Sequence, residues 1–246
     1  MDKMIDTITF DLWNTLVCNT PRDGQRYKDF RLKGIEEALS EAGITVDLND
    51  LEEAHDHTFD ECKKFWDKNI DIDSNTQIDI LLGMLTDLNP KNLDQEILKK
   101  IKKAYIEPVL YNHPDLVANA QEVLSGLKEK GYKIGLICNT GRTPGNVARK
   151  LLGEFEVLGY FDGLSFSNEL RVRKPHKKIF LYTLNQLESL PRTSVHVGDE
   201  LKTDVLGAKN VGMNTVHLKR KDQHYQDIVP DRTIFDLKEL FEILLT

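Results

Sequence analysis

The segment TITFDLWNTLVCN, residues 7–19, contains the residues that decide the fold of this chain. Its first part, TITF, carries apolar Ile8 and Phe10 and predicts a short buried strand that ends at Phe10. A carboxylate, Asp11, follows directly, and Trp13 comes two residues later. Because a buried charge is costly unless it is paired, Asp11 at the end of such a strand needs partners from elsewhere in the chain.

Four more segments have the length and apolar character of short strands. They are YKIGLIC (132–138), GLSFS (163–167), TSVHV (193–197) and NTVHL (214–218), and the second of these is the weakest. Helical patterns occupy DLVANAQEVLSGLKEKGY (115–132), HKKIFLYTLNQLES (176–189) and ELKTDVLGAKNVG (200–212), and TIFDLKELFEILL (233–245) predicts a closing amphipathic helix. Short apolar strands that alternate with helices predict an α/β fold with a Rossmann-like, mostly parallel sheet.

The chain between the first two strands shows helical patterns and no convincing strand. This insert of about ninety residues is far longer than the roughly 2–6 residues that usually connect a strand and a helix. We therefore predict a second, helical domain at 19–111, inserted into a discontinuous α/β core at 1–18 and 112–246. The predicted hinges between the two lie near 19–22 and 109–114.

The composition limits the classes of function. The chain has 246 residues, of which 30% are charged, and a net charge of -7. Because nucleic-acid binding depends on clustered cations, we do not expect nucleic acid as a partner, whereas a small phosphorylated ligand needs only a local positive pocket. Three cysteines without CxxC spacing favour a reducing compartment. No apolar signal segment and no membrane-length apolar run is present, so we predict a cytoplasmic protein without membrane contact and leave its oligomeric state open.

Acidic residues follow two of the predicted strands. Asp11 comes after TITF, and Asp199 and Asp204 lie in VHVGDELKTD (195–204). Because ligands bind at the carboxyl ends of the strands in open α/β sheets, we expect these carboxylates to converge. Converging carboxylates repel one another unless a cation lies among them, and oxygen ligands suit Mg²⁺. Asp199 alone is equally compatible with a helix cap, but Asp11 and Asp199 together favour a metal site.

Two other segments bring polar groups toward the same edge of the sheet. Lys174, in RVRKPHKKIF (171–180), could neutralise carboxylate and phosphate charge, although its spacing alone is typical of a surface lysine. Asn139 and Thr140 follow the strand that ends at Cys138, and this polar turn could either hold an anion or cap the next helix. Cys138 itself is compatible with simple core packing.

Taken together, these residues resemble the haloacid dehalogenase-like (HAD) superfamily of hydrolases. The four family motifs correspond to Asp11-Leu12-Trp13-Asn14-Thr15 for D-x-D-x-T, Cys138 with Asn139 at a strand end, Lys174-Pro175, and Gly198-Asp199 with Asp204. They occur in the family's order and cover core segments of about 150 residues. The helical insert lies where this family places its C1-type helical cap, so the resemblance implies a cap domain at 19–111.

The resemblance also implies an activity. Asp11 would be a nucleophile that forms a covalent aspartyl intermediate, which water then hydrolyses, and a small phosphorylated metabolite would be the substrate. The site residues that it implies are catalytic Asp11 and Lys174; substrate-binding Cys138, Asn139 and Thr140; Mg²⁺-binding Asp11, Asp199 and the backbone carbonyl of Trp13; and supporting Thr15 and Asp204.

Trp13 departs from the family pattern. The phosphatases of this family carry an Asp at that position, which protonates the leaving oxygen, and an indole cannot do so. The haloacid dehalogenases carry an aromatic Tyr there, but they work without metal and lack the Gly-Asp that this chain keeps at Gly198-Asp199. We therefore favour magnesium-dependent phosphoryl chemistry over 2-haloacid dehalogenation. A weakly active or non-catalytic binding protein with the same fold is a further alternative.

Overall fold

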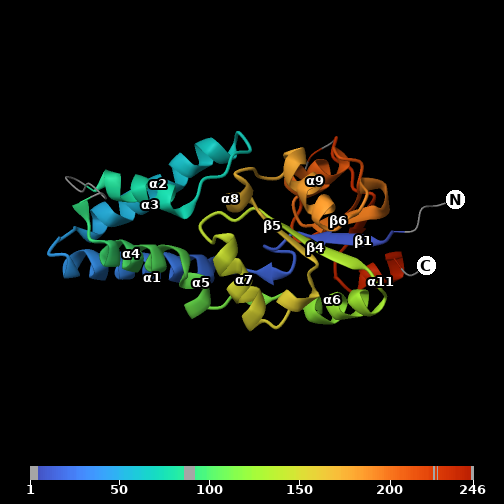
Figure 1. The fold of residues 1–246 in the computed structure, drawn as a ribbon, viewed down its shortest axis with the longest axis horizontal. Helices are drawn as coiled ribbons and strands as arrows, with labels where there is room; N and C mark the ends of the chain where they lie inside the picture. The colour runs from blue at the N-terminus through green and yellow to red at the C-terminus, as the bar shows by residue number, and fades with distance from the viewer. Residues whose placement is uncertain (1–4, 86–91, 224, 226, 245–246) are drawn as a thin grey trace.

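The computed structural model describes residues 5–85, 92–223, 225 and 227–244. An α/β core lies at one end of an elongated molecule, and a bundle of helices lies at the other end (Figure 1). The predicted fold class, a Rossmann-like parallel-sheet core with an inserted helical cap, is confirmed.

Six parallel strands form the sheet of the core, in the order β5-β4-β1-β6-β7-β8. Their bounds are β1 Thr7–Phe10, β4 Lys133–Cys138, β5 Gly163–Phe166, β6 Ser194–Gly198, β7 Asn214–Leu218 and β8 Arg232–Ile234. β1 is central, and its last residue, Phe10, aligns with Leu136 of β4 and Val197 of β6. The strand order reverses at β1, so the loops that follow β1, β4 and β6 meet at one edge of the sheet.

Helices cover both faces of the sheet (Figure 1). The helical elements of the core are α6 Ala120–Glu129, α7 Gly145–Glu154, η2 Leu158–Tyr160, α8 Ser167–Leu170, α9 Lys177–Gln186, η3 Pro191–Thr193, the π-helical turn η4 Leu201–Val205, α10 Leu206–Lys209 and α11 Glu239–Leu244. α6 and α11 lie on the opposite side of the sheet from α9. These helices enclose strands that are buried on both faces, such as β1, in which all four residues are buried.

All five strands expected from the sequence are present, but the prediction of one helix over 233–245 was wrong at its start. Arg232–Ile234 pair in parallel with β7 as the edge strand β8, and α11 begins only at Glu239. Leu245 lies outside the described residues. A three-residue strand is too short to show the alternation by which strands are recognised, so the apolar residues around it merged with the helical pattern.

In the described part of the cap, there are four long α-helices and one short one. Their bounds are α1 Pro21–Glu41, α2 Leu48–Trp66, α3 Ser74–Met84, α4 Gln95–Ile106 and α5 Pro108–Tyr111. α1 begins with a capping box, in which Thr20 and Asp23 each accept a hydrogen bond from the other's backbone amide. α1 and α4 pack so closely that a Cβ on Gly34 would lie 2.7 Å from the Cβ of Ala104.

A short antiparallel pair joins the two chain passages between core and cap. β2, Val17–Cys18, pairs with β3, Asp115–Leu116, and the sequence did not indicate either strand. The predicted helix over 115–132 therefore starts later, at Ala120. The second predicted hinge, 109–114, overlaps the short helix α5, and the exact domain limits and hinges stay predictions.

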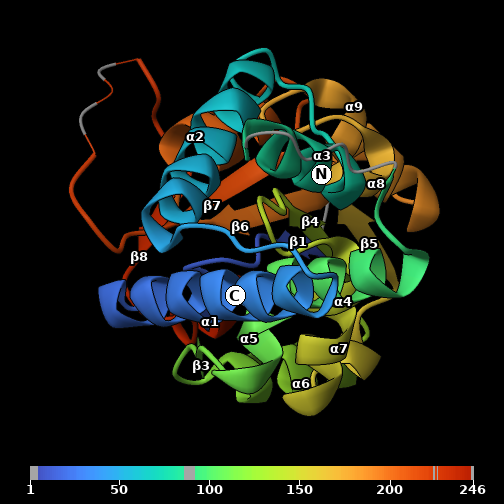
Figure 2. The same ribbon diagram turned by 90° about the vertical axis from the view of Figure 1, so that its left-hand side faces the viewer.

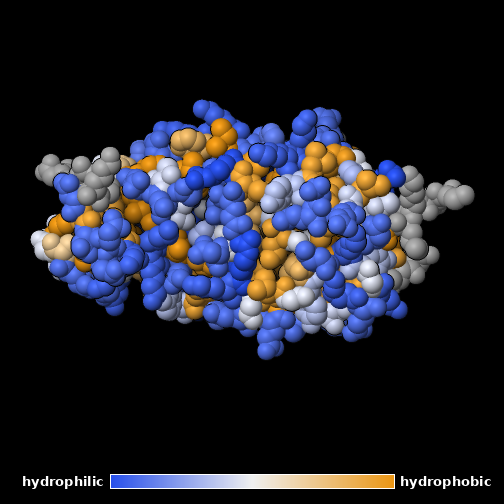
Figure 3. All heavy atoms as spheres, in the orientation of Figure 1, coloured by the Kyte–Doolittle hydropathy of each residue, from blue (hydrophilic) through white to orange (hydrophobic). Residues whose placement is uncertain are grey.

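Figure 3 shows one face of the molecule, on which hydrophilic residues dominate and hydrophobic ones form scattered patches. Along the described residues, no helix combines the length and the apolar character needed to cross a bilayer.

Candidate active site

Asp11 occupies the first position after the central strand β1. Its backbone amide donates to the carbonyl of Val197 at 2.9 Å, which extends the pairing with β6 by one residue. The chain then turns sharply, because the amides of Leu16 and Val17 both donate to the carbonyl of Leu12 at 2.9 Å. Asn14, with a φ of 60°, supplies the left-handed residue of this turn. The turn keeps the Asp11 carboxylate, only 6% exposed, at the edge of the sheet where the loops meet.

Lys174 is a buried residue, 3% exposed, although its spacing in the sequence is typical of a surface lysine. Its Nζ donates to Asp11 Oδ1 at 2.5 Å and to Asp204 Oδ1 at 2.6 Å. The carboxamide of Asn139 holds the main chain of Lys174 from both sides. Oδ1 of Asn139 accepts from the amide of Lys174 at 2.9 Å, and Nδ2 donates to its carbonyl at 3.1 Å. The ammonium is therefore fixed between two carboxylates.

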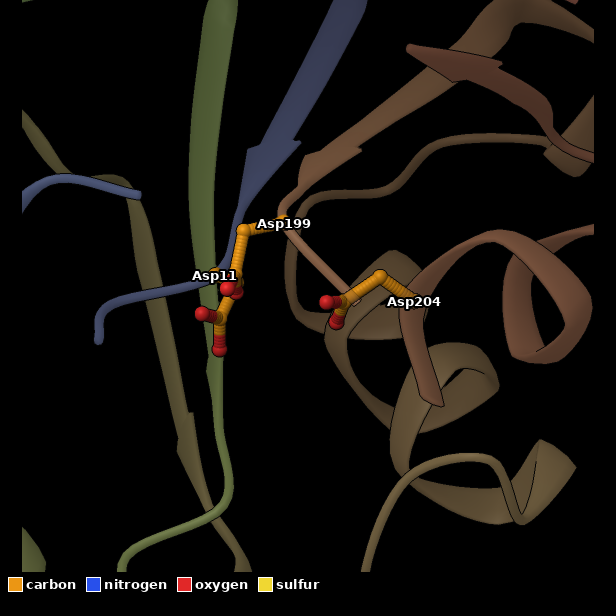
Figure 4. A group of neighbouring side chains, drawn as sticks. All are labelled: Asp11, Asp199 and Asp204. Carbon is orange, nitrogen blue, oxygen red and sulfur yellow. The ribbon is translucent and has the colours of Figure 1, made fainter. Parts of the chain in front are cut away.

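Three carboxylates converge here, as the sequence predicts. One oxygen from each of Asp11, Asp199 and Asp204 lies within 4.8 Å of the others. In Figure 4, Asp11 and Asp199 lie next to each other at the ends of their strands, and Asp204 faces them from the following helical turn. Among the described residues, no hydrogen-bond donor reaches the side chain of Asp199, which is 3% exposed. An unpaired buried carboxylate beside a second one fits a divalent cation bound by oxygen ligands.

Asp204 differs from the other two carboxylates because its oxygens are already satisfied. Besides Lys174, it accepts from the amide of Glu200 at 3.0 Å and lies 3.2 Å from Nε2 of His196. The other ring nitrogen of His196, Nδ1, lies 2.8 Å from Thr9 Oγ1. Asp204 thus orients Lys174 and leaves Asp11 and Asp199 as the carboxylates that can hold a cation. The sequence did not indicate His196, because one histidine on a buried strand has no pattern of its own.

Burial and mutual repulsion shift the titration of these carboxylates. Burial, and to a smaller extent Asp204, raise the pKa of Asp11 to about 6, although Lys174 opposes the shift. Burial and then the charges of Asp11 and Asp204 raise the pKa of Asp199 to about 8. Burial also acts to raise the pKa of Asp204, but Lys174 and His196 outweigh it and hold that pKa well below its usual range. The site therefore has a deficit of positive charge near Asp199.

For Lys174, the neighbouring charges decide the direction of the pKa shift. Burial acts to lower the pKa of Lys174, but the carboxylates of Asp11 and Asp204 outweigh burial and raise that pKa above its usual value. Lys174 therefore remains an ammonium across the physiological pH range.

A cavity of about 220 Å³ opens beside these groups. It is lined by Asp11, Trp13, Asn14, Asn139, Lys174, Asp199, Glu200, Thr203 and Asp204. Trp13 is half-buried and forms part of the cavity wall. Thr15 Oγ1 donates to Asp11 Oδ2 at 3.4 Å from within the turn. The carbonyl of Trp13 as a metal ligand stays a prediction.

The three residues predicted to bind substrate occupy different environments. Asn139 lines the cavity, whereas Cys138 is fully buried in the hydrophobic core. Burial raises the pKa of the Cys138 thiol far above its usual value, so the side chain acts there as a small apolar group. Thr140 is buried as well, and its hydroxyl donates to Asp71 Oδ2 at 3.3 Å, while its amide donates to Ser167 Oγ at 2.9 Å. The substrate-binding role of all three stays a prediction.

Asp71, in the connection between α2 and α3 of the cap, was not among the predicted residues. Its side chain is fully buried and forms an ion pair of 2.9 Å with Arg173, the neighbour of Lys174. Trp66 Nε1 donates to it at 3.0 Å, and Ser167 Oγ donates as well. The backbones also meet here, where Ile70 pairs with Val172 in an antiparallel bridge. A single acid in a long polar loop carries no sequence signal of such a contact.

A family model of haloacid dehalogenase-like hydrolases matches residues 5–212 of this chain. Among curated proteins, a glyceraldehyde 3-phosphate phosphatase of Pyrococcus abyssi is 32% identical over 222 residues, which cover 88% of this chain and 82% of the relative.

Two solved structures are similar over almost the whole chain. A HAD phosphatase from Thermococcus onnurineus is 25% identical, with a TM-score of 0.66 and 98% of both chains covered. A 2-haloacid dehalogenase from Pseudomonas syringae pv. Tomato is also 25% identical, with a TM-score of 0.71, and 98% of this chain and 99% of that chain are covered. Similar structures thus include a phosphatase and a dehalogenase.

Proposed function

Because this chain belongs to the haloacid dehalogenase-like hydrolases, we propose that it is a magnesium-dependent phosphatase acting on a small phosphorylated metabolite. The observation that carries this proposal is the buried group of Asp11, Asp199 and Lys174 at the carboxyl ends of the strands. Asp199 is the deciding member, since its buried carboxylate has no protein donor among the described residues. The phosphatase relative from Pyrococcus abyssi supports the same class of reaction.

In this proposal, a carboxylate oxygen of Asp11 attacks phosphorus while the bond from phosphorus to the leaving-group oxygen breaks and the leaving group departs. Water then hydrolyses the aspartyl phosphate to free phosphate and the Asp11 carboxylate. Oδ1 of Asp11 accepts from Lys174 at 2.5 Å and Oδ2 accepts from Thr15 at 3.4 Å, so we assign the attack to Oδ2, which is held less tightly. Lys174 also offsets the repulsion between this carboxylate and the incoming phosphate. Asp204 keeps the ammonium in place through the contact of 2.6 Å.

Mg²⁺ would be held by the carboxylates of Asp11 and Asp199 and by the carbonyl of Trp13. When bound, it supplies positive charge that stabilises the transferring phosphoryl group. Asn139 also lines the cavity. It is the proposed contact to the phosphoryl oxygens on the side away from the cation.

Trp13 defines the kind of substrate that we expect. An acid/base group contributes roughly 10²–10⁴ in rate, and an indole at this position contributes none of it. Substrates whose leaving group needs no proton, such as acyl phosphates and aryl phosphates, should therefore react faster than alkyl phosphates.

A 2-haloacid dehalogenase is the second candidate. It is favoured by the aromatic Trp13 in the cavity wall and by the similar structure of the enzyme from Pseudomonas syringae. Halide leaves without a proton, so the missing acid would cost nothing. We rank this candidate lower because an unpaired Asp199 beside Asp11 suits a cation, and a cation would weaken Asp11 as a nucleophile toward carbon. A non-catalytic binding protein is the remaining alternative.

We also propose that residues 19–111 form the substrate-selecting cap and that residues 1–18 and 112–246 form the catalytic core. A cytoplasmic location stays a prediction from the cysteine content, and the oligomeric state stays open.

Phosphate release from acetyl phosphate with Mg²⁺ tests the proposal. Asp11→Asn should lower the rate by at least about a thousandfold, because it removes the nucleophile. Calorimetry should show that Asp199→Ala weakens Mg²⁺ binding, and equal affinity in the wild type and the variant would contradict the metal site.

A further inference from the structure

Gln223, in the connection between β7 and β8, binds the main chain around Asp199 with both polar atoms of its carboxamide. Nε2 donates to the carbonyl of Asp199 at 2.7 Å, and Oε1 accepts from the amide of Leu201 at 2.9 Å. A side chain that donates and accepts in this way fixes both the position and the orientation of the peptides between them. His217 Nε2, on β7, donates to the same Asp199 carbonyl at 3.0 Å.

Two neighbours of Gln223 bind the same loops. Arg220 Nε donates to the carbonyl of Asn14 at 3.0 Å, in the turn that follows Asp11. Lys221 Nζ lies 2.6 Å from Glu200, the residue after Asp199. We call Lys219–Gln223 the strap, because it contacts the loops after β1 and β6. In Figure 2, the coloured parts of the connection between β7 and β8 extend away from the sheet.

The strap binds the main chain of Asp199, whose side chain accepts no hydrogen bond from the described residues. Since no described donor reaches the Asp199 carboxylate, its direction depends on the main chain that carries it. That main chain is held on one side by β6 and on the other by the carboxamide of Gln223. The family model ends at residue 212, so the strap lies beyond the matched part of the chain.

We infer that the strap fixes the main chain of Asp199–Leu201 and that Gln223 is a positioning residue for the cation site. This inference rests on the proposed metal role of Asp199. Some groups hydrogen-bond to metal ligands without contacting the metal. Their removal typically lowers metal affinity by about 10–100-fold. His217 remains in Gln223 variants, so we expect an effect near the lower end of this range.

The test uses the full chain and two readouts. Gln223→Ala should weaken Mg²⁺ binding, measured by calorimetry, by about tenfold, and should speed hydrogen exchange of the Leu201 amide in the metal-free protein. Gln223→Glu keeps the acceptor for Leu201, so its exchange should stay slow. Its Mg²⁺ affinity is not compared, because the added carboxylate attracts the cation by itself. Gln186 is an exposed glutamine whose Oε1 accepts a hydrogen bond from Ser165 Oγ. Gln186→Ala is therefore the matched control, and it should change neither Mg²⁺ affinity nor exchange at Leu201.

Unchanged Mg²⁺ affinity in Gln223→Ala, with faster exchange at Leu201, would overturn the positioning role. Unchanged exchange would overturn the strap itself, whatever the metal result. Wild-type protein that does not bind Mg²⁺ would count against the proposed function, and exchange at Leu201 would then decide the strap alone.

Discussion

Trp13 is the residue on which the choice between phosphatase and dehalogenase depends most. It lies in the wall of the cavity beside Asp11. The motif resemblance assigns it to the position of the acid/base Asp of the family's phosphatases. The side chain removes proton transfer, whereas the backbone carbonyl at the same position is available in any variant.

Replacing Trp13 by Asp should restore the missing acid. Turnover of alkyl phosphates should rise by at least about tenfold, since general acid catalysis contributes ~10²–10⁴. Turnover of p-nitrophenyl phosphate should rise less, because nitrophenolate leaves without a proton. Steady-state kinetics on both substrates measure the difference, and Trp13→Phe serves as the control. A folded Trp13→Asp protein without any gain would show that leaving-group protonation does not limit the rate.

His55, in α2 of the cap, predicts a pH dependence of stability. Burial, followed by the nearby Arg142, lowers its pKa from 6.5 to about 4, and its Nε2 has no partner among the described residues. Between these two pH values, His55 binds more protons in the unfolded chain than in the folded one. Its contribution to the free energy of unfolding is therefore complete above pH 6.5 and is lost as the pH falls toward 4. The loss should reach up to about 3 kcal/mol.

Urea denaturation at several pH values measures this effect. His55→Leu removes the titration, so its free energy of unfolding should fall less than that of the wild type between pH 7 and pH 4. Parallel curves for the two proteins would mean that His55 is not responsible.

Among single residues, the sequence predicted the convergence of Asp11, Asp199 and Asp204, because they follow strands whose carboxyl ends meet at one edge of an α/β sheet. It did not predict that Lys174 is buried, since a basic segment such as RVRK has the composition of a surface. Neither His196 nor Asp71 could be found, because each acts through a contact between distant segments and has no local pattern.

Among the elements, the turn between β6 and η4 fixes the geometry of the site. A Cβ added to Gly198 would lie 2.4 Å from Cγ of Asp204, so an alanine there must displace the carboxylate that holds Lys174. Gly198→Ala should therefore lower the free energy of unfolding by about 1–3 kcal/mol and reduce turnover as well.

Chemical denaturation and kinetics test this substitution together. Gly153, in α7, has no atom within 4 Å of an added Cβ, so Gly153→Ala is a matched control that should be as stable as the wild type or slightly more stable. Wild-type activity in Gly198→Ala would show that Asp204 can move without consequence.

The connection between α2 and α3 predicts a second effect at the level of elements. Asp71→Ala would leave Arg173 half of a buried ion pair, and breaking such a pair costs about 3–5 kcal/mol. Thermal unfolding should show this loss, and the fluorescence of Trp66 should change because its indole loses its acceptor. Glu61→Ala, which removes an exposed pair with Lys64 on α2, should have little effect. Equal stability of the two variants would contradict a structural role for the Asp71 contact.

The order of elements was readable from the sequence wherever a segment has a helical period or at least four residues of apolar character. The helical insert shows the period and the five predicted strands show the apolar character, whereas β2, β3 and β8 have two or three residues each and depend on pairing alone. Pairings between segments as distant as Val17 and Leu116 are tertiary, and a local pattern does not contain them.

Over the whole molecule, the fold brings together groups that are far apart in the chain. Asp11, Lys174 and Asp199 follow separate segments, and the parallel sheet with β1 at its centre places them at one edge. Because three carboxylates converge beside Lys174, we propose that this ammonium and a bound cation together admit an anionic substrate. We propose that this arrangement performs magnesium-dependent phosphoryl transfer.

A panel of substrates with and without Mg²⁺ tests that claim most directly. Acetyl phosphate, p-nitrophenyl phosphate and 2-chloropropionate would be offered to the wild-type protein, and released phosphate and chloride would be measured in parallel. For a magnesium-dependent phosphatase, we expect phosphate release that requires Mg²⁺ and exceeds chloride release. Chloride release that is independent of Mg²⁺, without release of phosphate, would contradict it.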